Sequence, residues 1–369
     1  MQPQILLSIL VPNRQSTPYI FKTIENILDC KDERFELLVN ENSMPEFLDY
    51  SRFESDHRFK IFREPTPISM TQNWYNILEK ATGKYVIYIG SDDGCIPENL
   101  SILISYLAKN SFDAINTRHS FYNHPAPYSK SFITLGKKIV TMRSYTFTYP
   151  KLLSLLFYSY RTWLPLPYAL AVVKREVFCC IIEKYKEIPG IAPDDFLSHF
   201  VAQKLKTGIF FDLCVFITGT SPRSNGQSLL THNLQENSKQ FIADSRLKHG
   251  KLTKDFGLNC LPSIAIEHYL LARSIVSNRK SKVGKLLKLW AVASCLDKSH
   301  HKSKLFLISH SIRKIVIPFL DRIIKFIWKI SQFGIHLPTS NTKIANSQLT
   351  NVSEAARFIH DNTKYEEMT

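Results

Sequence analysis

Three short polar segments of the chain carry residue types that could do chemistry. Residues 40–43 (Asn-Glu-Asn-Ser) and 91–94 (Ser-Asp-Asp-Gly) each end an apolar run, whereas residues 193–195 (Pro-Asp-Asp) begin an apolar stretch of helical period. Adjacent carboxylates repel each other unless a cation or hydrogen-bond donors compensate them. Asp92 and Asp93 are therefore candidates to bind Mg²⁺ or Mn²⁺ together with a diphosphate.

Each of these segments also has an ordinary structural explanation. Residues 40–43 are compatible with an Asx turn, and residues 91–94 with a solvated turn or a cap for the helix that begins at Pro97. Acidic residues at 194 and 195 match the usual preference of the first helical turn for negative charge. In the functional interpretation, one of these two carboxylates is a general base that the same helix end keeps ionised.

Strand-like runs and helical periods alternate over the first 120 residues. The patterns predict strands at residues 5–11, 35–39, 59–62, 85–89 and 114–117, and helices at residues 19–28, 69–80 and 97–109. This alternation is typical of a doubly wound α/β sheet with crossover helices. Ligands of such sheets bind at the carboxyl ends of the strands, which is where residues 40–43 and 91–94 fall.

Taken in order and spacing, the motifs resemble those of the inverting family 2 glycosyltransferases of the GT-A fold, over roughly residues 6–228. The matching segments are Leu-Ser-Ile-Leu-Val-Pro-Asn-Arg (7–14), Val-Asn-Glu-Asn-Ser (39–43), Met-Thr-Gln-Asn-Trp (70–74), Ala-Thr-Gly-Lys-Tyr (81–85), Ser-Asp-Asp-Gly (91–94), Pro-Asp-Asp (193–195) and Ser-Pro-Arg-Ser-Asn-Gly (221–226). The resemblance implies an α/β fold whose mixed sheet, flanked by helices, binds a nucleotide sugar.

The resemblance also implies roles for individual residues. It assigns nucleotide-sugar binding to Pro12, Arg14, Asn40, Glu41, Asn73, Asp92 and Arg223. Asp92 and Asp93 match the metal-binding pair of the family, with Asp93 favoured as the direct ligand of Mn²⁺ or Mg²⁺. Asp194 or Asp195 matches the catalytic base, with Asp195 favoured.

Two positions depart from the family pattern. Asn40 stands where relatives usually have one of two acids that bind the base and the ribose, which leaves the identity of the base open. Ser91 stands where many relatives have a first aspartate. Inverting transfer needs a leaving-group stabiliser and one base but no protein nucleophile, and the sequence accordingly has no Ser/His/Asp or Cys/His signature.

The charge of the chain is concentrated near its C-terminus. The 369 residues include 47 Lys and Arg and 32 Asp and Glu, for a formal net charge of +15, and 44% are hydrophobic, which excludes wholesale disorder. Residues 273–336 contain fourteen Lys and Arg against two Asp. The seven cysteines are scattered without C-x-x-C spacing, so they suggest neither a zinc knuckle nor a disulfide scaffold.

A helical wheel of residues 311–333 places the charges in a narrow basic arc beside a wide apolar face, as in an interfacial helix on anionic lipid. The alternative is a helix that docks on the catalytic domain. No nucleic-acid recognition motif accompanies this charge, so we expect no nucleic-acid partner. We also expect no signal peptide and no membrane-spanning helix, and a cytoplasmic protein that is peripheral on the inner face of the membrane.

The predicted domains are a catalytic domain at 1–230 (donor half about 1–120, acceptor half about 121–230), a helical basic region at 231–336 and a polar flexible tail at 337–369. The predicted function is inverting transfer of a sugar, UDP-linked, to a hydroxyl of a glycan or a polyprenyl-diphosphate-linked acceptor in bacterial cell-surface polysaccharide synthesis. Two alternatives stay open: a catalytically silent, membrane-associated GT-A module, which Asn40 favours, and a sugar-phosphate nucleotidyltransferase.

Overall fold

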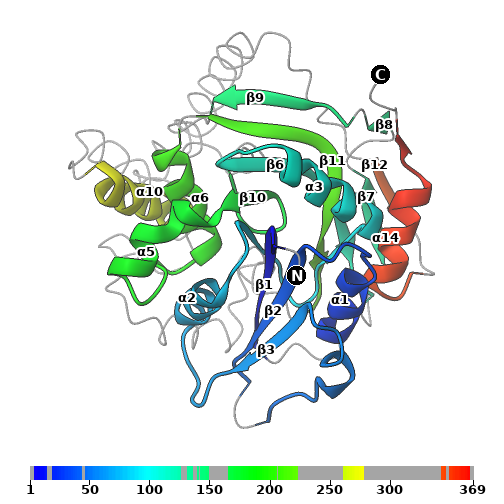
Figure 1. Cartoon of the computed structure of the whole chain (residues 1–369), viewed down its shortest axis with the longest axis horizontal. Helices are drawn as coiled ribbons and strands as arrows, with labels where there is room; N and C mark the ends of the chain where they lie inside the picture. Colours follow the sequence, from blue (N-terminus) through cyan, green and yellow to red (C-terminus); the bar gives the residue numbers. More distant parts are fainter. Residues whose placement is uncertain are drawn as a thin grey trace, which may run out of the picture.

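The computed structural model describes residues 4–14, 19–43, 46–125, 131–135, 139–140, 142–148, 165–205, 207–222, 261–277, 342–345 and 349–365. A mixed sheet runs through these residues, with helices on both of its faces (Figure 1). The strand order along its main path is β12 (Thr342–Ala345), β7 (Phe132–Leu135), β6 (Ala114–Asn123), β10 (Ala171–Lys174), β4 (Tyr85–Tyr88), β1 (Leu7–Asn13), β2 (Phe35–Glu41) and β3 (Phe59–Arg63).

The N-terminal part of the sheet is parallel. Its strands are β1 (Leu7–Asn13), β2 (Phe35–Glu41), β3 (Phe59–Arg63) and β4 (Tyr85–Tyr88). The accompanying helices are α1 (Tyr19–Leu28), α2 (Met70–Lys80) and α3 (Pro97–Lys109). Because these strands are parallel, their carboxyl ends lie at the same edge of the sheet, and the loops that follow β1, β2 and β4 meet there.

The remaining strands make the sheet mixed. β10 (Ala171–Lys174) runs antiparallel between β4 and β6 (Ala114–Asn123). The long β11 (Thr207–Thr220) is parallel to β6 and antiparallel to two further strands, β5 (Gly94–Cys95) and β9 (Ser144–Thr148). The predicted α/β class, with a mixed sheet flanked by helices, is therefore confirmed.

Alternation along the buried strands explains why the sheet is covered on both faces. Ile9 and Val11 of β1 belong to the core beneath α1 and α3, whereas Leu10 belongs to the core beneath α2. Successive strand residues point to opposite faces, so a continuous apolar run needs packing on both sides. Two further helices, α5 (Cys179–Lys184) and α6 (Pro193–Lys204), contribute to the α2 core.

The predicted N-terminal elements agree closely with the observed ones. The helices expected at 19–28 and 97–109 have those bounds in the structure, and the helix expected at 69–80 begins one residue later, after the Ser69 cap. The strand expected at 114–117 is longer, because β6 continues to Asn123. Its extension pairs with β11 and with β7 (Phe132–Leu135), which no local pattern reveals.

The end of the chain is not the flexible tail predicted for residues 337–369, at least in its described part. β12 (Thr342–Ala345) pairs with β7, and β13 (Lys364–Tyr365) pairs with β8 (Ile139–Val140). Between them, helix α14 (Val352–Asp361) buries Val352, Ala355, Ala356 and Ile359. The prediction was wrong because overall polarity hides one apolar stripe at helical spacing.

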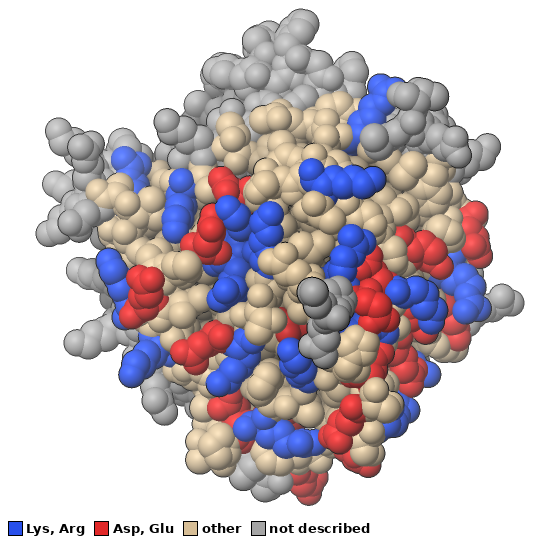
Figure 2. Space-filling model, viewed as in Figure 1, with Lys and Arg blue, Asp and Glu red and all other residues tan. Residues whose placement is uncertain are grey.

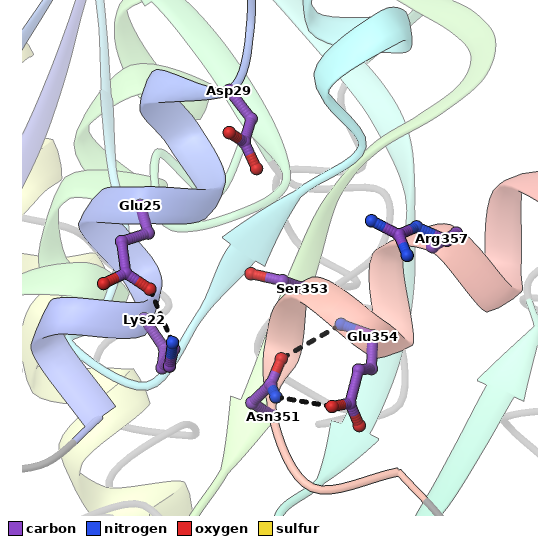
Figure 3. Close-up of a pocket in the computed structure, with 7 residues that line it drawn as sticks. All are labelled: Lys22, Glu25, Asp29, Asn351, Ser353, Glu354 and Arg357. Carbon is purple, nitrogen blue, oxygen red and sulfur yellow. Dashed lines mark hydrogen bonds and ion pairs between the residues drawn. The ribbon is translucent and has the colours of Figure 1, made fainter.

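A groove of about 480 Å³ separates α1 from α14 (Figure 3). It is lined by Lys22, Glu25, Asp29, Asn351, Ser353, Glu354 and Arg357. Lys22 pairs with Glu25 at 2.7 Å, and the Asn351 side chain accepts a bond from the Glu354 amide as the helix cap. None of the predicted site residues lines this groove.

Part of the predicted basic region, 231–336, is described as helix α10 (Leu261–Ser277), which packs against α6. The amphipathic segment 311–333 lies outside the described residues. Within the described part of the chain, no helix is both long enough and apolar enough to cross a membrane. Figure 2 shows Lys and Arg interspersed with Asp and Glu over the visible face, which fits a near-neutral charge outside residues 273–336.

Glu36 on β2 is a buried carboxylate, 1% exposed, near the amino ends of the parallel strands. It accepts bonds from the Ser8 hydroxyl (2.7 Å), the Thr82 amide (2.7 Å) and the Lys60 ammonium (2.7 Å). Burial alone would raise the pKa of Glu36, but these donors outweigh burial and lower it below its ordinary value of 4.5. The carboxylate thus joins β1, β2, β3 and the segment before β4.

We expect Glu36→Gln to lower the free energy of unfolding at pH 7 by about 1–3 kcal/mol, because the amide cannot accept all these bonds. The folded pKa is depressed, so the stabilisation is complete above the unfolded pKa and is lost as the pH falls through the folded pKa. Urea unfolding at several pH values should therefore show the variant converging on the wild type in acid. Glu33→Gln, at a 53% exposed side chain, is the control and should change little.

Candidate functional site

A polar cluster lies at the carboxyl ends of β1 and β2. The register places Asn13 opposite Glu41, and the Asn13 amide donates to Glu41 Oε2 at 2.8 Å. Tyr50 also donates to this oxygen. Glu41 is fully buried, and its other oxygen, Oε1, has no hydrogen-bond partner among the described residues, nor has Asn13 Oδ1. Two buried acceptor atoms therefore lack donors in this cluster.

Asn40 and Asn73 complete the cluster. The Asn40 amide donates to Asn73 Oδ1 at 2.6 Å and to Glu64 Oε1 at 2.7 Å. The Asn73 amide in turn donates to the backbone oxygen of Asn13 at 3.3 Å. The structure thus brings the predicted residues Asn40, Glu41 and Asn73 together. Pro12 pairs with Asn40 across the strands, and the exposed Arg14 follows β1.

Hydrogen-bond donors surround the carboxylate of Asp93, in the turn after β4. Asp93 is 0% exposed, and its carboxylate accepts the amide of Gly90 at 2.5 Å and the amide of Gly219 at 2.7 Å. Tyr168, which forms a bridge with Tyr88 of β4, donates its hydroxyl to Asp93 as well. Asp92 is only partly buried and accepts the Ser221 amide at 3.2 Å.

The backbone of this turn is fixed from two sides. Thr23 of α1 shares its hydroxyl between the carbonyls of Ser91 (2.9 Å) and Asp93 (2.7 Å). On the other side, His124 Nε2 donates to the Asp92 carbonyl at 2.8 Å. Gly219 lies directly against that carbonyl, because a Cβ there would be 1.7 Å from the oxygen. Only glycine allows β11 to approach the turn this closely.

Burial and mutual repulsion shape the electrostatics of the two aspartates. Burial, and then the charge of Asp92, raise the pKa of Asp93 to about 7, and burial raises the pKa of Asp92. Burial also lowers the pKa of His124, so this ring is a neutral donor. The pKa of Tyr168 is raised well above its ordinary value by burial and then by Asp93, Asp92 and Asp194, so it remains protonated.

The third predicted segment forms the start of α6. Asp195 is 7% exposed, and its Oδ2 accepts a bond from His268 Nδ1 of α10 at 2.8 Å. Its neighbour Asp194 is more exposed and is close enough to Tyr168 to affect the pKa of that hydroxyl. The charge of Asp194 thus acts on Tyr168, which bonds to Asp93, whereas Asp195 lies against α10. The remaining predicted residue, Arg223, lies outside the described residues.

Several residues of the site are not predicted by any sequence pattern. Tyr168, His124, Gly219 and His268 all reach the predicted aspartates from distant parts of the chain. The separation between Asp93 and Gly219 is 126 residues, and that between Asp195 and His268 is 73 residues. No spacing rule joins residues so far apart, and a single histidine or glycine in a strand or helix gives no local signal.

The donor set of the turn fits a divalent cation that shares its ligands with a substrate. Two carboxylates lie side by side; burial raises the pKa of both, and the charge of Asp92 raises that of Asp93 further, so a bound cation would compensate their negative charge. The described residues contain no group of three or more His, Cys, Asp or Glu positioned for a metal. Asp92 and Asp93 would therefore hold the ion with oxygen ligands from phosphates and water, as Mg²⁺ commonly is held.

The chain is similar in sequence to known glycosyltransferases. Residues 8–158 match the family described as glycosyl transferase family 2. The predicted resemblance to a family 2 glycosyltransferase is thus confirmed. A protein of Rickettsia bellii named "Uncharacterized glycosyltransferase" is 24% identical over 137 residues, which are 36% of this chain and 20% of that protein. The chain therefore matches a fifth of the length of this relative.

Two solved structures of S. aureus TarS also resemble the chain. One has a TM-score of 0.47 at 15% identity and covers 79% of this chain and 54% of that chain. The other, TarS 1–349 in complex with UDP-GlcNAc, has a TM-score of 0.48 at 12% identity and covers 93% of this chain and 98% of that chain.

We expect Gly219→Ala to displace the Asp92–Asp93 turn, because the new methyl group would overlap the Asp92 carbonyl. Overpacking of this kind lowers the free energy of unfolding by about 1–3 kcal/mol, which urea denaturation would measure. Thr218→Ala, one residue earlier in β11 and partly exposed, is the matched control and should cost less. Equal stability of the Gly219 variant and the wild type would contradict the close approach.

Proposed function

We propose that the protein is an inverting glycosyltransferase that moves a sugar from a nucleotide-diphosphate donor, UDP-linked, to a hydroxyl group. The observation that carries this proposal is the donor-lined Asp92–Asp93 turn, which follows β4 at the same edge of the sheet as the polar ends of β1 and β2. A cation-binding pair, a nucleotide-binding cluster and an accessible carboxylate are the parts that this reaction needs. The match of residues 8–158 to glycosyl transferase family 2 supports the same conclusion.

The nucleotide is proposed to bind at the ends of β1 and β2. Glu41 Oε1 and Asn13 Oδ1 are buried acceptors without a donor among the described residues, which suits a ribose hydroxyl or a base N–H. Asn40 and Asn73 lie in the same hydrogen-bond network. Pro12 and Arg14, at the end of β1, and Arg223, beyond β11, are the further candidates for contacts with the donor.

Asp92 and Asp93 are proposed to hold Mn²⁺ or Mg²⁺. When bound, such an ion stabilises the negative charge of a diphosphate leaving group. The sequence favours Asp93 as the direct ligand, but both of its oxygens already accept backbone amides and the side chain is fully buried. We therefore propose that Asp92 offers the more accessible ligand oxygen and that Asp93 fixes the turn and balances the charge.

Asp194 is proposed as the general base, although the motif alone favours Asp195. In a single displacement, the acceptor oxygen bonds to the anomeric carbon as the bond to the diphosphate oxygen breaks, and the acceptor proton passes to a carboxylate. Asp194 is supported by its greater exposure and by its closeness to Tyr168. Asp195 is supported only by the motif, since His268 already occupies its Oδ2 and burial limits its access.

The acceptor side of the proposal rests on the sequence. A glycan or polyprenyl-diphosphate-linked acceptor in bacterial cell-surface polysaccharide synthesis suits the family resemblance. The amphipathic basic segment at 311–333 suits association with the anionic inner face of the cytoplasmic membrane.

Calorimetry with UDP-, GDP- and dTDP-sugars, with and without Mn²⁺, tests the donor proposal. We expect one donor class to bind, more tightly with Mn²⁺. Asp92→Asn and Asp93→Asn should each weaken the Mn²⁺-dependent binding at least about tenfold, because the first removes a charged ligand oxygen and the second removes a charge that balances the cation. Asp29→Asn, on the α1–α14 groove, is the matched control and should bind like the wild type.

Failure of every donor to bind, with or without Mn²⁺, would contradict the proposal and favour a catalytically silent module. Release of pyrophosphate from a nucleoside triphosphate and a sugar phosphate would instead indicate a nucleotidyltransferase.

Turnover of the donor found by calorimetry distinguishes the two candidate bases. We expect Asp194→Asn to lower kcat by about 10²- to 10⁴-fold at an unchanged donor Kd, as loss of a general base does. Asp195→Asn should mainly lower the melting temperature, because the amide oxygen can still accept the bond from His268 while the amide group, which also carries donors, fits the buried site less well. The opposite pattern, with kcat lost only in Asp195→Asn, would assign the base to Asp195.

A further inference from the structure

His268 of α10 is a buried histidine, 2% exposed, that makes two directed hydrogen bonds to the segment before and at the start of α6. Its Nδ1 is 2.8 Å from Asp195 Oδ2, and its Nε2 is 3.1 Å from the backbone nitrogen of Ile191. Both nitrogens of one ring are thus engaged by residues on either side of the 192–194 stretch, which includes Asp194.

The two bonds assign the tautomer of this ring. The Ile191 amide can only donate, so Nε2 must be the acceptor and must lack a proton. The proton of the neutral imidazole therefore lies on Nδ1 and is donated to Asp195. A neutral ring in this orientation satisfies a buried amide and a buried carboxylate at once, and no other uncharged side chain offers a donor and an acceptor at this separation within a rigid ring.

The chain before α6 is shaped around this imidazole. Gly190 has a φ of +95°, a left-handed conformation that favours glycine, and a Cβ there would lie 2.5 Å from His268 Nε2. Phe196 contacts the ring edge-on, with centroids 6.2 Å apart. The backbone of residues 190–191 therefore packs directly against the imidazole ring of His268.

The other end of the same segment is attached to α2. Glu187 accepts bonds from the hydroxyls of Ser69 (3.1 Å) and Thr71, and the Ile188 amide donates to the Thr71 carbonyl at 3.2 Å. Residues 187–195 are therefore fixed by α2 at one end and by α10 at the other. In Figure 1, α10 lies beside α6, and the two helices pack against each other.

We propose that His268 is a positioning residue that fixes residues 190–195 and so presents Asp194 to the site. The inference rests on the proposed function, because it gives Asp194 the role of base. It also means that the geometry of the base depends on α10, a helix outside residues 8–158 that match the family. Replacing the ring should leave donor binding intact and impair the step in which the acceptor loses its proton.

Three variants of the full-length protein separate the two bonds. His268→Asn keeps a donor near the Nδ1 position, His268→Gln keeps an acceptor near the Nε2 position, and His268→Phe keeps a ring without either. With the donor found by calorimetry and water as the acceptor, we expect His268→Phe to lower kcat about 10- to 100-fold, the cost of a misplaced group, with donor Kd unchanged. The Asn and Gln variants should each recover part of this loss.

Hydrogen exchange followed by mass spectrometry gives a readout that does not require turnover. In His268→Phe, the amides of residues 187–195 should exchange at least about tenfold faster, because local opening becomes easier, while those of β1 and β4 stay protected. Ile275→Ala, two turns further along α10 in the same core, is the matched control. It should lower the melting temperature without changing kcat or exchange at 187–195.

Unchanged kcat and unchanged exchange in His268→Phe would overturn the inference. Equal losses in His268→Phe and Ile275→Ala would overturn it too, because docking of α10 in general would then explain the effect. Failure of the wild type to bind any donor would overturn the proposed function instead, and the exchange measurement would still decide whether His268 fixes the segment.

Discussion

The candidate site depends on one buried carboxylate, that of Asp93, and on the donors that surround it. The Gly90 amide comes from its own turn, the Gly219 amide from the end of β11 and the Tyr168 hydroxyl from the segment before β10. These donors lower the cost of burying a charge next to Asp92 but do not remove it, since the pKa of Asp93 is still raised to about 7. A buried pair of adjacent carboxylates is an arrangement suited to receive a cation.

The path of β11 is a consequence of this carboxylate. The strand must bring a backbone amide to Asp93 while it passes the Asp92 carbonyl, and only glycine at 219 leaves room for both. The strand also pairs with β5 directly after the turn, and α14 packs against β5 from the C-terminal end of the chain. Helix α14, which lies in a C-terminal segment of polar composition, thus packs against the strand that directly follows the Asp92–Asp93 turn.

Asn40 shows how local electrostatics accounts for a departure from a family motif. Its amide donates to the Glu64 carboxylate and to Asn73 Oδ1. An aspartate at position 40 would place a second carboxylate against Glu64 and would repel it. An amide side chain at position 40 is therefore compatible with Glu64 and Asn73. Glu41 supplies the one carboxylate of this loop, and Asn13 and Tyr50 both donate hydrogen bonds to it. Asn40 does not by itself indicate a silent module.

The sequence by itself determined the elements whose signals are local. Apolar runs defined β1 to β4, the helical periods and Pro97 defined α1 and α3, and the strand-end loops placed Asn40, Glu41, Asp92 and Asp93 at one edge of the sheet. Tertiary structure alone decided what surrounds these residues. It supplies Tyr168, His124, Gly219 and His268, separates the surroundings of Asp194 from those of Asp195, and packs α14 against β5. The physical reason is the separation along the chain over which each kind of interaction acts. Periodicity and helix-start residues act over a few positions, whereas the hydrogen bonds from His124, Gly219 and Ser221 to the Asp92–Asp93 turn join residues 32 to 129 positions apart. These bonds depend on how the sheet brings distant strands together.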